Sequence, residues 1–298
     1  QFLDELAARN PIEEGVGQYV NLKRSGSNLM GLCPFHSEKS PSFSVSPDKG
    51  LFYCFGCHKG GSVIGFEMEI EGLSYGDAVR ALAQRAGMDV PEDEENRELY
   101  QKQERLWALN KEAARFFVKE LYGPFGREGL AYAQKRGMSK GTLTRFGIGF
   151  APNEWRNLCD AMRAKGYTEE ELLASGLALK KDRGLYDCFR NRLMFPIIDV
   201  RGNVIGFGGR GMDDSKPKYL NSPDTLVFNK RKNLFALNIA KKSKLDYLIL
   251  VEGYMDAIAL HQYGFDCAVA SLGTSLTDEH ARLISRYTKQ IVLIYDGD

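Results

Sequence analysis

The sequence predicts an α+β protein that ends in an α/β unit. Three observations lead to this fold class. Cysteine and histidine pairs flank a hairpin-like pattern near the N-terminus, a strongly charged segment follows it, and apolar strand patterns alternate with helical patterns from residue 245 onward. The chain has 298 residues, of which 43% are hydrophobic and 27% are charged. These values are typical of a folded protein with about two or three domains and exclude a disordered chain.

The overall charge is balanced, with 40 Lys and Arg against 39 Asp and Glu. This balance excludes a uniformly basic nucleic-acid coat but leaves room for a local basic patch. No apolar run approaches the ~18 residues that would cross a bilayer, and no secretory signal core is visible, so we expect no membrane association. The six cysteines suit a reducing compartment, so we expect a cytoplasmic protein. The chain begins at Gln1 instead of Met, so we expect it to have been cut from a longer one.

Residues 1–90 are predicted to form a small first domain. The stretches 42–46 and 51–54 alternate apolar and polar residues on either side of Pro47-Asp-Lys-Gly50, which is a turn sequence. A helix is expected to begin after Ser74, whose side chain can cap it.

Two pairs of metal-ligating residues frame this hairpin. Cys33-Pro-Phe-His36 and Cys54-Phe-Gly-Cys57 each place two residues between the ligands, and seventeen residues separate the pairs. A tetrahedral Zn²⁺ needs two such chelating pairs, which a hairpin would bring together. The spacing therefore predicts one structural zinc ion, in preference to an iron–sulfur site. His58 is expected to be a surface residue, because four ligands complete a structural zinc site.

Basic and aromatic residues surround the predicted zinc site. Basic groups with exposed aromatic rings would suit single-stranded nucleic acid, through phosphate contacts and base stacking. The alternative is that most of these rings form the core of the hairpin. The residues are Lys23, Arg24, Phe35, Lys39, Phe43, Lys49, Phe52, Phe55 and Lys59.

A charged segment at 91–105 is predicted to be a tether or the exposed start of a helix, and a domain boundary. Residues 106–244 are predicted to form a mixed α+β basic subdomain. Within it, the runs 193–199 and 203–207 flank Arg201-Gly202 and indicate an antiparallel hairpin.

The balanced total charge hides a basic stretch at 201–244. It contains ten Lys or Arg and three Asp, a local net charge of +7. A groove lined in this way attracts polyanions, so we expect it to bind nucleic acid or nucleotide phosphates, although a charge run is often only a solvated face.

Gly206-Phe-Gly-Gly-Arg-Gly211 matches the dinucleotide-binding pattern G-x-G-x-x-G. That interpretation is rejected, because no apolar helix follows directly and a lysine, Lys230, lies near the position where an acid is expected. The glycines are instead expected to let another backbone or a nucleic-acid strand come close.

Residues 245–298 are predicted to form a parallel βαβαβ unit with right-handed crossovers. The expected elements are strands at 247–251, 267–270 and 291–295 and helices at 254–263 and 278–287.

Acidic residues follow two of these strands. Glu252 directly follows one strand, and Asp296-Gly-Asp298 directly follows another. Ligand sites of open parallel sheets lie beyond the carboxyl ends of the strands, so these carboxylates should converge there, with Asp256 one helical turn after Glu252. Oxygen ligands of this kind favour Mg²⁺ or Mn²⁺ and suit phosphoryl transfer. The alternative is that the acids only cap the following helices.

Taken together, these motifs resemble those of bacterial replicative DNA primases. The two Cys/His pairs look like the zinc-binding domain of that family. Val251-Glu-Gly-Tyr-Met-Asp256 and Tyr295-Asp-Gly-Asp298 look like TOPRIM motifs. Leu193-Met-Phe-Pro196, Val204–Arg210 and Pro217–Ser222 look like the basic subdomain that precedes TOPRIM, and the segments occur in the family's order.

The resemblance implies a Mg²⁺-dependent RNA polymerase that synthesises short RNA primers from ribonucleoside triphosphates on single-stranded DNA. The residues implied to bind zinc are Cys33, His36, Cys54 and Cys57. The residues implied to form the magnesium and catalytic site are Glu252, Asp296, Asp298 and Asp256. The residues expected to contact nucleic acid or nucleotide are Arg210, Lys218, Lys230, Arg201, Lys232 and Asn221.

The family continues beyond Asp298 with the rest of TOPRIM and a helicase-binding domain. We therefore expect a truncated TOPRIM unit here, impaired activity of this chain alone, and a replicative helicase as a partner only through the absent part. The alternatives are a TOPRIM topoisomerase or nuclease, and an inert zinc-dependent module that binds single-stranded DNA.

Overall fold

The computed structural model describes residues 2–90, 94–182, 184–213 and 217–295, with only the backbone for 94–97. It divides the chain into two compact units, Gln1–Asn96 and Arg97–Asp298. No helix in the described part of the chain is both long and apolar enough to cross a membrane.

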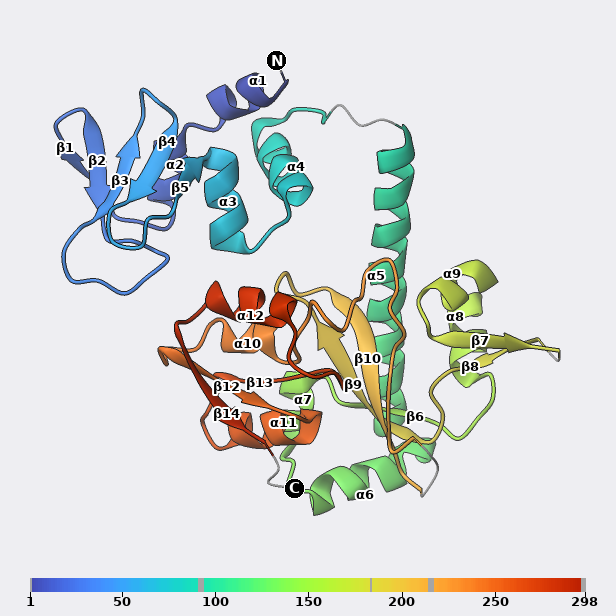
Figure 1. The fold of residues 1–298 in the computed structure, drawn as a ribbon. Helices are drawn as coiled ribbons and strands as arrows, with labels where there is room; N and C mark the ends of the chain where they lie inside the picture. Colours follow the sequence, from blue (N-terminus) through green and yellow to red (C-terminus); the bar gives the residue numbers. More distant parts are fainter. Residues whose placement is uncertain (1, 91–93, 183, 214–216, 296–298) are drawn as a thin grey trace. The chain divides into compact units, whose positions relative to one another are not determined.

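In its described residues, the first unit combines a five-stranded antiparallel sheet, in the order β1-β2-β3-β4-β5, with four short helices (Figure 1). Its elements are α1 (Phe2–Arg9), α2 (Ile12–Gly17), β1 (Lys23–Ser25), β2 (Asn28–Gly31), β3 (Phe43–Ser46), β4 (Leu51–Cys54), β5 (Gly60–Ser62), α3 (Val63–Glu71) and α4 (Tyr75–Ala86).

The predicted hairpin and helix cap of this unit are confirmed. β3 and β4 pair antiparallel from Phe43 with Cys54 to Ser46 with Leu51. The Ser74 side chain caps α4 by accepting a hydrogen bond from the backbone N–H of Asp77.

Phenylalanines form much of the core of the first unit. Phe43 and Phe52 stack with ring centroids 5.2 Å apart, and Phe66 and Phe35 pack on them. Of the four aromatic residues that were candidates for base stacking, only Phe55 is largely exposed, at 65%. The alternative, a hairpin core made of these rings, therefore holds for most of them.

The second unit contains a long helix, an antiparallel sheet, a small hairpin and a parallel sheet (Figure 1). Its first elements are α5 (Glu94–Leu121), η1 (Pro124–Gly126), α6 (Arg127–Lys135), α7 (Lys140–Phe146), β6 (Gly149–Ala151), α8 (Asn157–Ala164), α9 (Glu169–Ala174), β7 (Ala178–Lys181) and β8 (Gly184–Asp187). They are followed by β9 (Arg192–Ile198), β10 (Val204–Gly211), β11 (Tyr219–Asn221), α10 (Leu237–Ala240), β12 (Tyr247–Val251), α11 (Tyr254–Gln262), β13 (Ala268–Ala270), α12 (Asp278–Ser285) and β14 (Gln290–Ile294).

The charged segment is helical from Glu94, so a helix rather than a tether forms over 94–105. Glu, Lys, Gln, Arg and Leu dominate this part of α5, and all of them are strong helix formers. Residues 91–93 lie outside the described part of the chain. The predicted boundaries at 90, 105 and 244 stay predictions.

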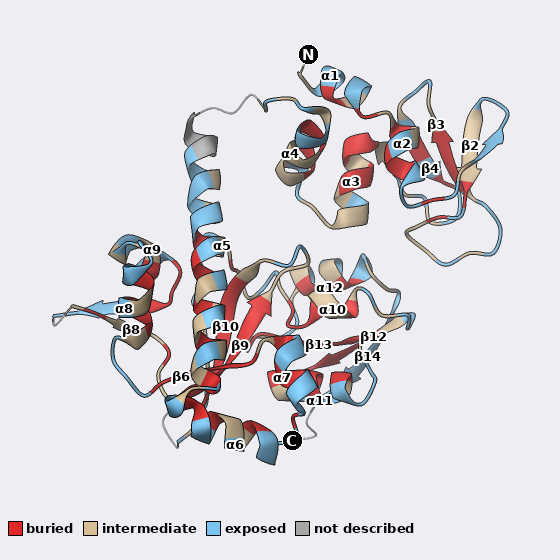
Figure 2. Cartoon of the chain, turned by 180° about the vertical axis from the view of Figure 1, so that it is seen from behind, coloured by how far each residue is buried: buried red, intermediate tan, exposed pale blue. Residues whose placement is uncertain are grey.

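The predicted alternation at the end of the chain is confirmed. β12 pairs in parallel with β13 on one side and β14 on the other, which gives the order β13-β12-β14 with α11 and α12 as the connections. The predicted hairpin also forms, as β9 and β10 of the antiparallel sheet β11-β10-β9-β6. Both strands are buried along most of their length, as Figure 2 shows.

The glycine-rich sequence lies within β10 and does not open a helix, in agreement with the rejection of a dinucleotide site. Gly206 and Gly208 make room for side chains and not for another backbone, whereas the approach of a nucleic-acid strand stays a prediction. A Cβ at Gly208 would lie 2.5 Å from the ring of Tyr254, and one at Gly206 would lie 3.2 Å from Phe228. Gly208 therefore lets α11 pack its first residue against the antiparallel sheet.

Candidate functional site

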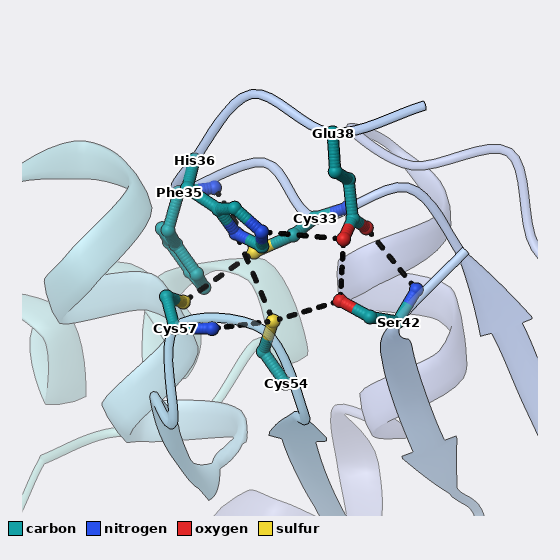
Figure 3. Close-up of polar contacts among 7 residues, drawn as sticks. All are labelled: Cys33, Phe35, His36, Glu38, Ser42, Cys54 and Cys57. Carbon is teal, nitrogen blue, oxygen red and sulfur yellow. Dashed lines mark hydrogen bonds and ion pairs between the residues drawn. The ribbon is translucent and has the colours of Figure 1, made fainter. Parts of the chain in front are cut away.

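The four predicted zinc ligands lie together in the first unit (Figure 3). One donor atom from each of Cys33, His36, Cys54 and Cys57 lies within 4.8 Å of all the others. Cys33 Sγ is 3.8 Å from Cys57 Sγ, and Cys54 Sγ is 3.8 Å from His36 Nδ1. Zn–S bonds of about 2.3 Å give a tetrahedral S···S edge of roughly 3.8 Å, so the donor set fits a zinc ion in both chemistry and spacing.

The two turns that carry the ligands also direct backbone N–H groups at sulfur. The N–H of Phe35 donates to Cys33 Sγ, and the N–H of Cys57 donates to Cys54 Sγ, both at 3.4 Å. Gly56 is required in the second turn, because a Cβ there would lie 2.6 Å from His36 Nε2.

The thiols of the cluster have unequal acidity. The pKa of Cys33 is raised to about 12, mainly by burial and in smaller part by the neighbouring Cys54 and Cys57 thiols, while the hydrogen bond from the Phe35 N–H opposes the rise. Burial also raises the pKa of Cys54, but hydrogen bonds from the Ser42 hydroxyl and the Cys57 N–H outweigh it and hold this pKa below the ordinary value. A bound cation would remove this difference between the thiols, because a metal ion deprotonates the thiols that coordinate it.

Glu38 is a functional candidate that spacing alone did not reveal. Its Oε2 lies 3.2 Å from His36 Nε2, while Nδ1 of the same ring faces the thiols. Its Oε1 accepts the N–H groups of Cys33 at 2.7 Å and Ser42 at 3.1 Å, and its Oε2 accepts the Ser42 hydroxyl at 2.5 Å (Figure 3). Ser42 Oγ is in turn 3.3 Å from Cys54 Sγ. A single carboxylate thus connects three of the four ligands, an arrangement that fixes ring orientation in metal sites.

The predicted acidic edge belongs to the second unit. Glu252 follows Val251, the last residue of β12, and is exposed. Val251 pairs with Ala270 of β13 and Ile294 of β14, so the three strands end at a common edge. Asp296 and Asp298 lie outside the described residues.

Asp256 lies in the first turn of α11 and is exposed, as is Glu252. A Cβ at Gly253 would lie 2.8 Å from Asp256 Oδ2. The carboxylate of Asp256 therefore points back toward Gly253, which directly follows Glu252. Gly253 is the N-cap of α11, and no side chain caps it. The alternative that Glu252 is a helix cap therefore finds no support, whereas Asp256 is placed where an acid also stabilises the helix dipole. Exposed carboxylate oxygens fit a hydrated divalent cation such as Mg²⁺.

Among the predicted basic residues, Arg210 has the most constrained position. It is 9% exposed on β10, and its Nε donates to the hydroxyl of Tyr132 at 2.5 Å. Its guanidinium lies 5.3 Å from the Tyr132 ring and 5.1 Å from the Tyr219 ring. Arg136, which the sequence reasoning missed, donates to the same Tyr132 hydroxyl. The ring of Tyr219 lies 6.5 Å from that of Tyr254, the first residue of α11, so this cluster lies near the helix that carries Asp256. Burial raises the pKa of Tyr219, Arg210 lowers it, and the charge of Asp256 raises it.

The segment that follows Lys230 is attached to the parallel sheet through backbone pairing. Phe235, a few residues beyond it, forms a two-way backbone bridge with Ala270 at the end of β13. The carbonyl of Lys230 lies 3.0 Å from Nε2 of the buried His280 of α12. The basic loop around Lys230 is therefore attached to the edge at which β12 and β13 end.

The other predicted basic or polar residues have varied positions. Lys218 and Lys232 are exposed. Asn221 uses its amide within the fold, because it accepts the Tyr254 hydroxyl at 2.5 Å and donates to the carbonyl of Leu272 at 2.8 Å. Arg201 lies in the turn before β10, beyond the end of the strand that is opposite Arg210. At ~3.4 Å per residue, the strand between them spans roughly 20 Å.

Comparison with known families gives three consecutive matches. Residues 1–98 match a CHC2 zinc finger, residues 116–241 match the N-terminal domain of the DNA primase catalytic core, and residues 249–298 match a Toprim-like domain.

Whole-chain comparisons agree with these matches. The chain is 48% identical over 303 residues to the DNA primase of Clostridium acetobutylicum, covering 100% of this chain and 50% of the relative. The crystal structure of the Aquifex aeolicus primase, which comprises zinc-binding and RNA polymerase domains, is 37% identical in sequence and has a TM-score of 0.62. This match covers 100% of this chain and 73% of that one. A primase catalytic domain bound to single-stranded DNA is 42% identical with a TM-score of 0.63, over 67% of this chain and 63% of that one. The chain spans about half the length of the curated relatives it matches.

Proposed function

The chain belongs to the bacterial DNA primase family, and we propose on this premise that it serves the synthesis of short RNA primers on single-stranded DNA. The matches to a primase catalytic core and to a CHC2 zinc finger favour this function over a TOPRIM topoisomerase or nuclease. The comparisons also disfavour an inert DNA-binding module, because the matches to primases extend over the whole length of this chain.

In this proposal the first unit is a zinc-stabilised module. The zinc-finger match and the Cys/His group support a bound Zn²⁺. Cys33, His36, Cys54 and Cys57 would hold the ion, and Glu38 would orient His36. The exposed Phe55 and the neighbouring lysines would contact template DNA by stacking and charge.

The catalytic step is assigned to the acidic edge of the second unit. Glu252, Asp296 and Asp298, with Asp256 nearby, would hold the divalent ion. When bound, Mg²⁺ or Mn²⁺ neutralises phosphate charge and favours ionisation of the attacking hydroxyl. The ribose 3′-hydroxyl attacks the α-phosphorus in line, and pyrophosphate leaves.

The basic residues would position the reacting strands. Arg210 and Lys230 would neutralise phosphates beside the acidic edge, because β10 packs against Tyr254 of α11 and the loop after Lys230 pairs with the end of β13. Lys218 and Lys232 are exposed near these segments and would contact the template backbone. Arg201 and Asn221 stay predictions as contacts to nucleic acid, since one lies at the far end of β10 and the amide of the other is already bonded.

One observation carries this proposal. β12, which is followed by Glu252, pairs with both β13 and β14, and the basic loop pairs with the end of β13. In this proposal, acidic and basic residues that are distant in sequence would thereby come to the same edge of the sheet.

The single-stranded DNA in a related catalytic domain supports DNA as the template. Ribonucleoside triphosphates, an RNA product and a replicative helicase bound through a further domain stay proposals.

The direct test is incorporation of labelled ribonucleotides on a single-stranded template by the protein that contains this chain. Template- and Mg²⁺-dependent formation of short RNA is the expected result. Relaxation of supercoiled plasmid without RNA synthesis would overturn the proposal in favour of a topoisomerase.

A further inference from the structure

The start of α12 is attached to the loop of residues 229–233, which the proposed function uses. This loop carries three consecutive cations, Lys230-Arg-Lys232. Three of its backbone carbonyls accept hydrogen bonds from two side chains at the start of α12, those of Thr277 and His280. In Figure 1 and Figure 2, α12 lies beside α10, the helix that follows this loop. The bonds join residues that are 46 to 50 positions apart in sequence.

His280 makes two of these bonds, and its exposed fraction is 0%. Its Nε2 lies 3.0 Å from the carbonyl oxygens of both Lys230 and Asn233. Its Nδ1 lies 3.3 Å from the backbone nitrogen of Thr277. A carbonyl only accepts and a backbone N–H only donates, so Nε2 must carry the proton and Nδ1 the lone pair. The contacts therefore fix one neutral tautomer, and the ring has no hydrogen-bonding capacity left for a ligand.

Thr277 makes the third bond. Its hydroxyl donates to the carbonyl of Arg231 at 2.9 Å and accepts the backbone N–H of His280 at 3.1 Å. Thr277 is also the N-cap of α12. A hydroxyl has one donor and can accept at the same time, so a single group both caps the helix and holds the loop.

The loop is held from its other side as well. The N–H of Lys230 donates to Oδ1 of Asp224 at 3.1 Å, so both polar groups of this peptide backbone are bonded. The ammonium of Lys230 forms no ion pair with any side chain that the structure describes, and the residue is half-buried. Ordering a loop costs conformational entropy, and these bonds offset that cost before a ligand arrives.

We propose that His280 and Thr277 are positioning residues for nucleotidyl transfer. They hold the backbone of residues 230–233 so that the ammonium of Lys230 meets a phosphate of the nucleotide. This inference rests on the proposed function, in which Lys230 neutralises phosphate charge. It adds two residues that contact neither the phosphate nor the metal and act only through the loop.

Limited trypsin digestion of the protein that contains this chain tests the loop without using activity. Trypsin cleaves after Lys and Arg, and three such residues are consecutive at 230–232. His280→Leu keeps a side chain of similar size but makes none of the hydrogen bonds, so cleavage at 230–232 should become several-fold faster relative to cleavage elsewhere. His280→Gln should restore slow cleavage, because glutamine can accept from the Thr277 N–H, as in a capping box, and donate to the carbonyls.

A second pair of variants covers the case in which His280→Leu fails to fold. Thr277→Gly removes the donor to Arg231, yet glycine is nearly as good an N-cap as threonine. It should therefore free the loop and leave α12 intact, whereas Thr277→Ser retains the hydroxyl and should behave like the unaltered protein. Thr168 caps α9 in the same way, with Glu171 in place of the histidine, so Thr168→Gly is the matched control.

The kinetic arm measures KM and kcat for ribonucleoside triphosphate at saturating template. Thr277→Gly and His280→Leu should raise KM by about 10- to 100-fold, the usual effect of losing a hydrogen bond to a charged group. Thr168→Gly should leave KM unaltered. A merely structural role would reduce the amount of active enzyme, and would thus lower kcat at an unchanged KM.

A double-mutant cycle shows whether the effect passes through the lysine. Lys230→Ala should raise KM by itself, and adding Thr277→Gly to it should raise KM no further, because the two residues act as one unit. Effects on KM that multiply in the double variant would overturn the inference.

The two arms separate this inference from the proposed function. Slow cleavage at 230–232 in both the Thr277→Gly and the His280→Leu proteins would overturn the positioning role, whatever their activity. Faster cleavage with unaltered KM would also overturn it, because the loop would be free without consequence for the nucleotide. Failure of the unaltered protein to make primers would instead overturn the proposed function, and the trypsin arm would still report on the loop.

Discussion

The carboxylate of Glu38 lies 3.2 Å from Nε2 of His36, whereas Nδ1 of the same ring lies 3.8 Å from the sulfur of Cys54. The imidazole is thus held between an acid and the thiols. A metal-ligating histidine that donates its other N–H to a carboxylate has a fixed tautomer and a fixed ring orientation.

We expect Glu38→Gln to weaken zinc binding by roughly 10- to 100-fold, the usual effect of losing such a partner. Glu38→Ala should weaken it more, because the N–H groups of Cys33 and Ser42 would also lose their acceptor. The measurement is zinc transfer to a chromophoric chelator. Glu14→Gln, an exposed change on α2 of the same unit, should leave the affinity unaltered. Equal affinities for the two glutamine variants would show that Glu38 does not support the site.

Removing zinc should unfold the first unit and spare the second. Structural zinc contributes about 10–16 kcal/mol in small domains, which is comparable to the whole stability of a typical domain. Hydrogen exchange after chelation should therefore show rapid exchange in β3 and β4, next to the ligands, and unchanged protection in β9 and β10. Cys54→Ser should behave like chelation, whereas Cys188→Ser in the second unit should retain one zinc. Full protection of β3 without metal would contradict this prediction.

The Cys/His cluster was predictable because chelating pairs leave a signature in local spacing. Glu38 was not, since a glutamate two residues after a ligand is common and only the folded turn brings it to His36 and Ser42. The parallel βαβαβ order was also predictable, because its strands are short apolar runs separated by helical patterns.

Long-range packing explains what the sequence did not reveal. The bridge between Phe235 and Ala270 depends on tertiary contacts, and no local pattern marks it. The close approach of Tyr254 to Gly208 likewise joins residues 46 positions apart. The sequence could therefore indicate that something packs closely against the glycines of β10, but it could not identify that neighbour.

Gly208→Ala should destabilise the second unit by about 1–3 kcal/mol, the usual cost of overpacking a core. The new Cβ would lie 2.5 Å from the Tyr254 ring, which cannot retreat, because it stacks on Phe195 and donates to Asn221. The melting temperature of this unit should fall by several degrees. Gly141→Ala in α7, where the nearest atom would be 3.8 Å away, should leave the melting temperature equal or higher. A neutral result at Gly208 would mean that α11 shifts freely against the sheet.

His261 should make the second unit sensitive to acid. Its ring is 3% exposed, and Nε2 bonds to the carbonyl of Ala268 at 2.7 Å. Burial lowers the pKa of His261, the charge of Arg145 lowers it further, and the contacts with Ala268 and Asp266 only partly offset this. The unfolded chain, with a histidine pKa of about 6.5, therefore binds the proton more readily, so stability is present above that pH and is lost as the pH falls toward the folded value.

Urea unfolding of the second unit between pH 8 and pH 5 measures this effect. His261→Gln, which can still donate to Ala268, should flatten the decline below pH 6.5 even if it lowers stability at pH 8. His58→Gln, at an exposed position in the first unit, should leave the decline as it is. A decline that is equally steep in the His261 variant would assign the acid sensitivity to other groups.

Glu252→Gln should reduce primer synthesis by roughly 100-fold or more in the protein that contains this chain. A divalent ion contributes several kcal/mol to stabilising the transition state, and each ~1.4 kcal/mol is a factor of ten in rate. The substitution is nearly isosteric at an exposed position, so zinc content and melting temperature should not change. Affinity for template should stay the same or rise, because a negative charge is removed.

The assay is labelled ribonucleotide incorporation with Mg²⁺ and, separately, with Mn²⁺. Glu128→Gln, an exposed change in the first turn of α6, is the matched control and should retain full activity. A Glu252 variant that synthesises primers at the wild-type rate with both ions would show that the end of β12 does not hold the metal. The pairing of β12 with β13 and β14 would then serve the fold alone.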